Sequence, residues 1–182
     1  TATVERLTAE DYRTMPDDGR RYQLVDGEIH MAPAPNSYHQ EIIWNLSQIL
    51  GSHLRQHPAG RIYLAPYDVY LSENDVVQPD LLFLAASRLS LRQEDGLHGA
   101  PDLVIEVLSP ATSQLDKKAK RALYARTGVK EMWLVDPILQ QIHLYDFARD
   151  PARAVRLIED DESFESPLLP GLRVNAAEVF RR

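Results

Sequence analysis

The sequence predicts one α/β or α+β domain in which helices pack against a β-sheet. The first observation is the order of the predicted elements, which runs helix, strands, helix, strands along the chain. The second is the length of 182 residues, which suits one compact domain and is short for two. The third is the absence of internal repeats, low-complexity segments and long linkers. We therefore expect residues 1–182 to form one domain.

The N-terminal residues predict a short helix followed by a β-hairpin. Thr8 is a suitable N-cap for the helix, because Asp11 lies three positions later. The strands of the hairpin are expected at 22–25 and 28–31, on either side of Asp26-Gly27. That dipeptide suits a two-residue turn, because both of its positions require positive φ.

A long helix is predicted over about 38–56. Ser37 followed by Gln40 resembles a capping box at its start, and apolar residues recur through it at helical spacing. His39 falls on this apolar stripe. A histidine there is more often a hydrogen-bonded core residue than a ligand, and the pattern alone leaves both interpretations open.

The middle of the chain predicts strands joined by a polar connection. Residues 62–71 alternate as a strand, Asp75 marks a turn, and 77–84 returns as a second strand. Residues 85–99 are polar and contain glycine, so a connection with a short helical turn is expected there. Leu103–Leu108 is almost entirely apolar, which is typical of a central strand covered on both faces.

The last third predicts a basic helix, three strands and a terminal helix. The basic helix covers Asp116–Thr127 and ends at Gly128, which suits a left-handed cap. The other expected elements follow in order: strands at 131–137, 141–147 and 155–158, and a short helix at 176–180 with Asn175 as its cap.

Composition limits the class of protein. The chain contains no cysteine, which excludes disulfides and a thiolate metal site. No stretch reaches the ~20 apolar residues of a membrane span, and residues 1–13 lack the apolar region of a signal peptide. The expectation is a soluble, cytoplasmic protein without a membrane partner. No histidine spacing indicates zinc, and there is no glycine-rich phosphate loop and no Gly-x-Ser-x-Gly motif.

The charge is negative overall but unevenly distributed. A net charge of −7 disfavours a nonspecific nucleic-acid coat, which is usually basic. Residues 116–130, however, contain six basic residues and one acid, whereas 159–162 are four consecutive acids. A local basic face beside a metal site is therefore compatible with phosphate binding.

Two acidic residues, Asp80 and Glu106, lie in runs of apolar, β-prone sequence. A carboxylate in such a run loses hydration, and burying it unpaired is costly. On adjacent strands ~4.8 Å apart, the two could share one Mg²⁺, as in sites that hydrolyse phosphodiester bonds. The alternatives are a structural ion pair for Glu106 and a turn residue for Asp80. Asp102, at the start of the strand and near solvent, is expected to be a capping or turn carboxylate.

Lys120, on the basic helix, is the candidate for a lysine beside this acidic pair. Its ammonium could position an attacking water and stabilise negative charge that develops on a phosphate. Helical periodicity predicts two opposite faces: Lys117, Lys120, Arg121 and Tyr124 on one, and Leu115, Ala119, Ala122 and Leu123 on the other. A solvated surface is the alternative for Lys117, Lys118 and Arg121. Glu28, directly after the hairpin turn, is by default an exposed residue.

Several motifs, taken in order, resemble one bacterial family. They are RYQLVDGE at 21–28, SYH at 37–39, VQPDL at 77–81, GAPDLVIEVLSP at 99–110, the segment from Lys120 through Tyr124 to Gly128-Val129, and EMWLVD at 131–136. Together they are similar to the Uma2 family of restriction-endonuclease-like proteins. The resemblance covers about residues 8–147, which leaves 148–182 as a C-terminal extension.

The resemblance implies a PD-(D/E)XK nuclease fold, in which a mixed central sheet is flanked by helices and the metal site lies at strand ends. It assigns the acidic pair of that fold to Asp80 and Glu106. The lysine usual two residues after the glutamate is replaced by Leu108, and the resemblance assigns that role to Lys120.

The resemblance also implies roles for two residues whose own signals are weak. Glu28 and His39 are expected to support the ligands or to contact a phosphate. Gln23 is a departure from the family pattern, because members often have glutamate there, and a supporting carboxylate is then missing.

The expected function is that of a metal-dependent endonuclease acting on DNA. Asp80, Glu106 and the carbonyl of Val107 are expected to bind Mg²⁺ or Mn²⁺, while Lys120 orients water. A homodimer is expected, because two-fold symmetry suits cutting both strands. The alternative is a catalytically inactive module that keeps the nuclease fold for binding or dimerisation, favoured by the acidic net charge and Gln23. A glycoside hydrolase is disfavoured, because aromatic residues make up only 8% of the chain.

Overall fold

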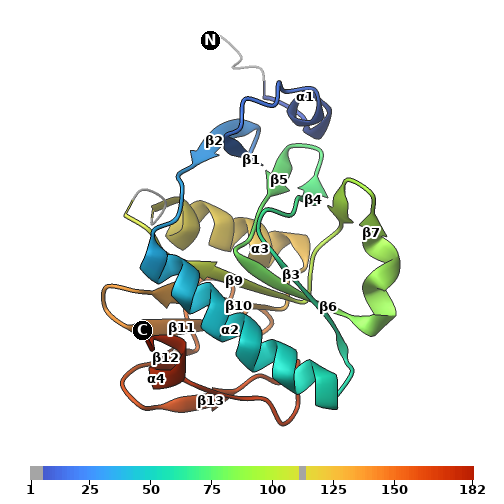
Figure 1. Cartoon of the computed structure of the whole chain (residues 1–182). Helices are drawn as coiled ribbons and strands as arrows, with labels where there is room; N and C mark the ends of the chain where they lie inside the picture. Colours follow the sequence, from blue (N-terminus) through green and yellow to red (C-terminus); the bar gives the residue numbers. More distant parts are fainter. Residues whose placement is uncertain (1–5, 111–113) are drawn as a thin grey trace.

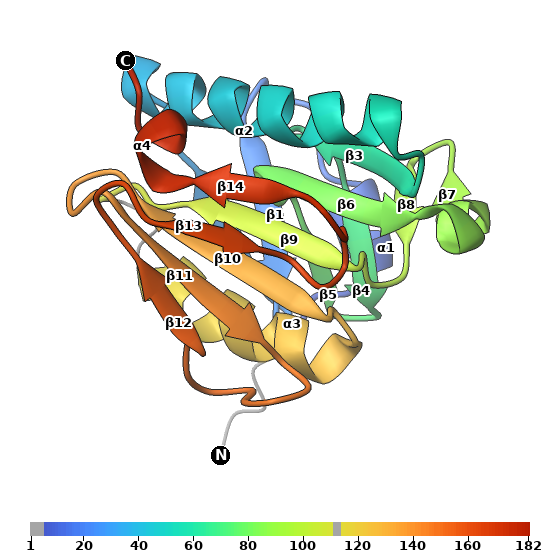
Figure 2. The same cartoon turned by 90° about the horizontal axis from the view of Figure 1, so that it is seen from below.

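The computed structural model of the chain describes residues 6–110 and 114–182, without the side chain of Asp116. Two six-stranded sheets form its centre (Figures 1 and 2). One sheet is the larger of the two because its strands are longer. It has the order β12 (Arg156–Ile158), β11 (Gln141–Asp146), β10 (Glu131–Asp136), β9 (Leu103–Val107), β6 (Leu81–Ala85), β3 (Gly60–Leu64). The smaller sheet has the order β2 (Glu28–Ala32), β1 (Arg21–Val25), β5 (Asp75–Val77), β4 (Val69–Ser72), β8 (Gly96–His98), β7 (Arg92–Gln93). Each sheet contains one parallel pair, so the predicted mixed sheet is confirmed.

Helices lie on both faces of the larger sheet. Figure 2 shows α2 (Ser37–Gln56) across one face and α3 (Arg121–Thr127) on the other. The strand β9 is buried along its whole length, and its side chains alternate between two cores. Leu103, Ile105 and Val107 belong to the core under α2, and Val104 belongs to the core under α3. The predicted central strand covered on both faces is confirmed.

The remaining elements lie outside the two six-stranded sheets. They are α1 (Ala9–Arg13), η1 (Ala86–Leu91), η2 (Leu115–Lys120), the two-stranded sheet β13 (Ser163–Glu165) and β14 (Arg173–Asn175), and α4 (Ala176–Val179). β13 and β14, of three residues each, were not predicted. None of the helices within the described ranges is long and apolar enough to cross a membrane.

The local turn and cap predictions agree with the structure at the N-terminus. Thr8 and Asp11 form a capping box at the start of α1. Asp26 and Gly27 have φ values of 52° and 77°, which is the positive φ that the hairpin turn requires. The cap of α2 was predicted one residue too late. Asn36 is the N-cap, because its Oδ1 accepts a hydrogen bond from the His39 N–H at 2.9 Å.

The two strands predicted at 62–71 and 77–84 are wrong, because each is divided between the two sheets. β3 ends at Leu64 and β4 begins at Val69, while β5 ends at Val77 and β6 begins at Leu81. Pro66 and Pro79 lie in the two interruptions, and proline cannot donate to a sheet ladder. Asp75 is therefore the first residue of β5 instead of a turn residue. The second interruption leaves Asp80 directly before β6.

The predicted basic helix begins as a π-helical segment, η2, and continues as α3. Gly128 ends α3 with a φ of 97°, as predicted. The last predicted helix is α4, whose N-cap Asn175 accepts a hydrogen bond from the Glu178 N–H at 3.2 Å.

Candidate functional site

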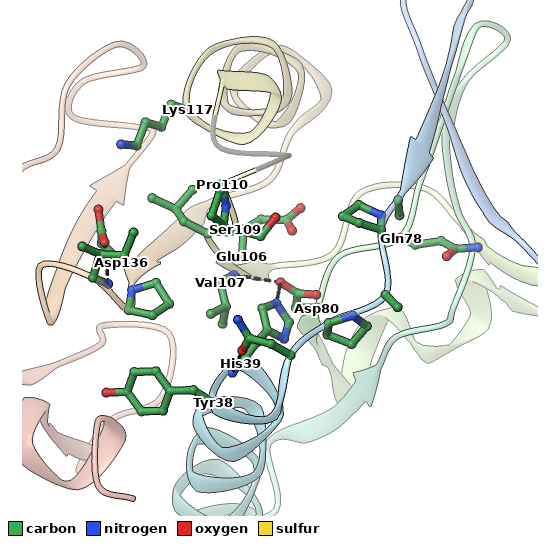
Figure 3. Close-up of a pocket in the computed structure, with 18 of the residues that line it drawn as sticks. Tyr38, His39, Gln78, Asp80, Glu106, Val107, Ser109, Pro110, Lys117 and Asp136 are labelled. Atoms are coloured by element: carbon green, nitrogen blue, oxygen red, sulfur yellow. Dashed lines mark hydrogen bonds and ion pairs between the residues drawn. The ribbon is translucent and has the colours of Figure 1, made fainter.

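Asp80, directly before β6, and Glu106, on the adjacent strand β9, lie at neighbouring positions. β6 and β9 are antiparallel and pair Leu81 with Ile105, so the next position of this register places Asp80 opposite Glu106. Both residues line a cavity of about 790 Å³ between the start of α2, the end of β9 and η2 (Figure 3). The predicted adjacency of the two acids is therefore present in the fold.

Asp80 is fixed through one of its oxygens. Its Oδ2 accepts a hydrogen bond from the Val107 N–H at 2.8 Å and lies 3.2 Å from His39 Nε2 (Figure 3). His39 is buried in the first turn of α2, where the Asn36 cap holds its backbone. Burial alone would lower the pKa of His39, but the hydrogen bond to Asp80 and the Asp80 charge raise it, with help from the Val107 backbone and Glu106, and the net pKa is raised. His39 is thus both a core residue and a partner of Asp80.

Glu106 is buried and bonded to two residues of the basic helix. Lys120 Nζ lies 2.8 Å from Glu106 Oε1, and the Tyr124 hydroxyl donates to the same oxygen at 2.6 Å. Lys120 is itself only 2% exposed. Leu108, which stands where the resemblance implies a lysine, is buried and contributes to the core under α3. The Lys120 ammonium therefore reaches the glutamate from the helix.

The predicted faces of the basic helix are wrong in part. Lys120 and Tyr124 are buried together with Leu123, while Ala122 is exposed. The π-helical segment lies directly before α3, and it changes the angular positions that a uniform 3.6-residue period assigns. Lys117 is exposed and lines the cavity (Figure 3).

Gln23 supports the segment that precedes Asp80. It is 4% exposed, lines the cavity, and its Oε1 accepts a hydrogen bond from the Gln78 N–H at 3.0 Å. The Gln78 side chain in turn donates to Asp68 Oδ1 at 2.8 Å. The residue that departs from the family pattern therefore lies close to the acidic pair and is bonded to the backbone two positions before Asp80.

Glu28 is not brought to this cavity. It is exposed at the closed end of the β1–β2 hairpin, where it pairs with Val25. The open end of the hairpin, with Arg21 and Ala32, is the part that lines the cavity. A five-residue strand separates the two ends, so the role expected for Glu28 has no support in this geometry.

Asp102 belongs to a separate ion-pair cluster. It is 1% exposed instead of solvent-accessible, and its Oδ1 lies 3.1 Å from Arg88 Nη1 and 2.7 Å from Lys130 Nζ. Its Oδ2 accepts from the Ala85 N–H at 2.8 Å. The expected structural role agrees with these contacts, although the expected exposure was wrong.

Two residues of the site were not predicted as such. Tyr124 contacts Glu106, and its spacing of four residues after Lys120 was a signal that the sequence contained. Asp136 lines the cavity at the end of β10 (Figure 3), but nothing local distinguishes it from other acids at strand ends.

The candidate donors suit a hard divalent cation. Asp80, Glu106 and the Val107 carbonyl offer oxygen atoms, which are the ligands that Mg²⁺ and Mn²⁺ prefer. All three residues line one cavity. In the part of the chain that the structure describes, no group of three or more His, Cys, Asp or Glu residues is arranged to hold a metal ion. Two carboxylates and a carbonyl therefore remain the candidate ligand set at this cavity.

Comparisons with known proteins agree with the fold and identify the family. Residues 9–177 match the model of a family, Uma2, that is described as "Putative restriction endonuclease". The match extends beyond residue 147, where the resemblance in the motifs ended. None of the curated proteins matches the chain. A crystal structure from Anabaena variabilis, described as "a putative nuclease belonging to DUF820", aligns with a TM-score of 0.80 at 20% sequence identity, covering 96% of this chain and 97% of that one.

Proposed function

The chain belongs to the Uma2 family, and on this premise we propose that it is a metal-dependent endonuclease that hydrolyses phosphodiester bonds of DNA. Family membership and the shared fold support a nuclease function. The observation that carries the proposal is the constellation in one cavity: Asp80 directly before β6, Glu106 on the adjacent strand β9, and Lys120 bonded to Glu106.

Each residue of the constellation has a role in this proposal. Asp80, Glu106 and the Val107 carbonyl would hold Mg²⁺ or Mn²⁺. A divalent ion there would supply positive charge for the phosphate and lower the pKa of a bound water. His39 orients Asp80, and Tyr124 orients Glu106, through the hydrogen bonds described above.

Lys120 has two tasks in the proposed reaction. Its ammonium holds Glu106 Oε1 at 2.8 Å, and it lines the same cavity, where it can position the attacking water. It also stabilises the negative charge that develops on the phosphate oxygens during attack. Because Lys120 is buried, this positive charge acts in a region of low dielectric, where it is stronger than on the surface.

The DNA substrate and a homodimeric state are part of the proposal. Arg21, Lys117 and Arg182 line the same cavity and offer positive charge to a phosphate backbone. A two-fold dimer would present two such cavities, one for each strand of a duplex.

Nicking of supercoiled plasmid DNA by the purified protein tests the function. Cleavage is expected with Mg²⁺ or Mn²⁺ and absent with EDTA, and Asp80→Asn and Glu106→Gln should each reduce the rate at least about a hundredfold. Glu94→Gln is the matched control, since Glu94 is exposed in the β7–β8 turn and outside the cavity. Nicking that persists in the Asp80 and Glu106 variants would show that another site, or a contaminant, cuts the DNA.

Calorimetric titration with Mn²⁺ separates the enzyme from an inactive module. An intact site binds Mn²⁺ in the wild type and loses that binding in Asp80→Asn. The inactive alternative is favoured by Gln23, which stands where many family members carry glutamate, and it predicts no binding that depends on Asp80.

A further inference from the structure

The turn between β10 and β11 exposes two large apolar side chains beside the cavity. In this turn, residues 137–140, Ile138 is 79% exposed and Leu139 is 60% exposed. No other large apolar side chain in residues 6–110 and 114–182 is as exposed as Ile138. Tight turns favour Gly, Asn, Asp, Ser and Pro, so adjacent Ile and Leu at this position have no explanation in turn chemistry. An interaction partner would account for them.

The backbone of this turn is fixed. Asp136 Oδ1 accepts hydrogen bonds from the N–H groups of Ile138 at 2.9 Å and Leu139 at 3.0 Å. Gln140 has a φ of 53°, and its Nε2 donates to the Tyr38 hydroxyl at 3.2 Å, which ties the turn to α2. The two apolar side chains are therefore presented to solvent from a held position.

The surroundings of the turn indicate what the partner is. Asp136 and Tyr38 line the cavity that also contains Asp80 (Figure 3), and Ile138 lines it too. Besides Lys120, three cationic side chains lie in the same lining: Arg21, Lys117 and Arg182. The Arg182 guanidinium is 4.3 Å from the centre of the Tyr38 ring, next to the turn. A partner with both negative charge and flat apolar surfaces fits this combination, and a nucleic acid has both in its phosphates and its bases.

We infer that Ile138 and Leu139 form a wedge that contacts unstacked bases of DNA bound across the cavity. Apolar side chains such as Ile and Leu insert between base steps in proteins that kink or open a duplex. The inference rests on the proposed function and adds to it that the substrate is locally unstacked beside the cleaved phosphate. DNA that unstacks easily, such as a duplex with a mismatch, is then the preferred substrate.

Duplex DNA that contains 2-aminopurine tests the wedge, because the fluorescence of this base rises when it unstacks. The titration is done in EDTA, so that no cleavage interferes. Wild-type protein should raise the fluorescence, and more so with a mismatch beside the probe. Ile138→Ser/Leu139→Ser should abolish the rise and weaken binding about tenfold. Leu157→Ser is the control, since Leu157 is 44% exposed on β12 and does not line the cavity; it should behave as wild type.

Three outcomes would overturn the wedge. One is an unchanged fluorescence rise in a folded double variant, as judged by circular dichroism. Another is equal loss in Leu157→Ser. The third is a difference in oligomeric state, in which analytical ultracentrifugation finds the wild-type protein as a dimer and the double variant as a monomer. The partner of the turn would then be a second copy of the chain.

The plasmid assay separates failure of the wedge from failure of the proposed function. If nicking depends on Asp80 but the double variant still unstacks DNA, only the wedge is refuted. If the fluorescence rise requires Ile138 and Leu139 but no nicking occurs, the wedge stands and the proposed chemistry fails.

Discussion

The two ends of β9 each bury a carboxylate, and the two carboxylates have different surroundings. Asp102, just before the strand, is bonded to Arg88, Lys130 and the Ala85 N–H. Glu106, near the end of the strand, is bonded to Lys120 and Tyr124 and lines the cavity. Both are at most 2% exposed, so burial alone does not distinguish them.

The positions of the cations distinguish the two ends. The side chains of Arg88 and Lys130 are 30% and 56% exposed, so the Asp102 cluster keeps its positive charges in contact with water. Burial would raise the pKa of Asp102, but Lys130, the Ala85 N–H and Arg88 outweigh it, and the pKa is lowered. The side chain of Lys120, in contrast, is only 3% exposed. A fully buried pair has a high desolvation cost and is a poor way to gain stability, which is compatible with the role proposed for Glu106.

Replacement of Lys120, the buried cation, should give the largest change in the free energy of unfolding. Lys120→Met leaves Glu106 buried without its lysine, so the free energy of unfolding should fall by about 3–5 kcal/mol. Urea denaturation in EDTA measures it. Lys117→Met, on the same helical segment but exposed, should change it by less than about 0.5 kcal/mol. The double variant Glu106→Gln/Lys120→Met should recover part of the loss. Wild-type stability in Lys120→Met would show that the pair is not energetically coupled.

Substitution of Asp102, at the other end of β9, should lower the free energy of unfolding and leave Mn²⁺ binding at the cavity unchanged. Asp102→Asn weakens both ion pairs and the hydrogen bond to Ala85, so the free energy of unfolding should fall by about 1–3 kcal/mol. Mn²⁺ affinity, measured by calorimetry, should remain that of wild type. Loss of Mn²⁺ binding at unchanged stability would remove the distinction between the two ends.

An added carboxylate at position 23 of the cavity lining should strengthen metal binding. Gln23→Glu keeps the acceptor for the Gln78 N–H and adds negative charge beside Asp80, so Mn²⁺ should bind about tenfold more tightly. Gln93→Glu makes the same change on exposed β7 and controls for net charge. An equal gain in both variants would mean that overall charge, not the cavity, is responsible.

Glu131 is another buried carboxylate, and its titration makes stability depend on pH. Its substitution should give the smallest change in stability. It is a buried carboxylate whose bonded partners are Trp133 and Ser166, both uncharged. Burial raises its pKa above the ordinary value of 4.5, although both hydrogen bonds lower it. An acid with a raised folded pKa binds protons better in the folded state, so the stability that it contributes is present below pH 4.5 and is lost as the pH rises through the folded pKa.

Glu131→Gln removes this titration. The stability of the variant relative to wild type should therefore increase between pH 4 and pH 7, by less than the change expected for Asp102→Asn. Thermal denaturation across this range measures it. A stability difference that does not vary with pH would mean that Glu131 titrates normally.

Most residues of the candidate site could be predicted from the sequence, but the contacts between them could not. Asp80 and Glu106 were identifiable because acids interrupt apolar runs, Lys120 because it lies on the basic helix after Glu106, and His39 because motifs resemble a family. The hydrogen bond from Tyr124 to Glu106 joins residues 18 apart, so its partner could not be read from local sequence. The separation of Glu28 from the cavity depends on which end of the hairpin lies near α2.

The sequence by itself determined the features that depend on near neighbours. These are the positive-φ turn at Asp26-Gly27, the Thr8 and Asn175 caps, the Gly128 helix end and the buried strand β9. Each follows from backbone sterics, capping hydrogen bonds or side-chain alternation within a few residues.

Only the tertiary structure decided the pairings across the chain. It divided two predicted strands between two sheets, placed Asp80 opposite Glu106, and brought His39 onto Asp80. Such contacts join distant positions, and their geometry depends on how β6, β9, α2 and α3 pack around two shared cores. Local pattern does not contain that information, because burial in a common core is a property of all the packed elements together.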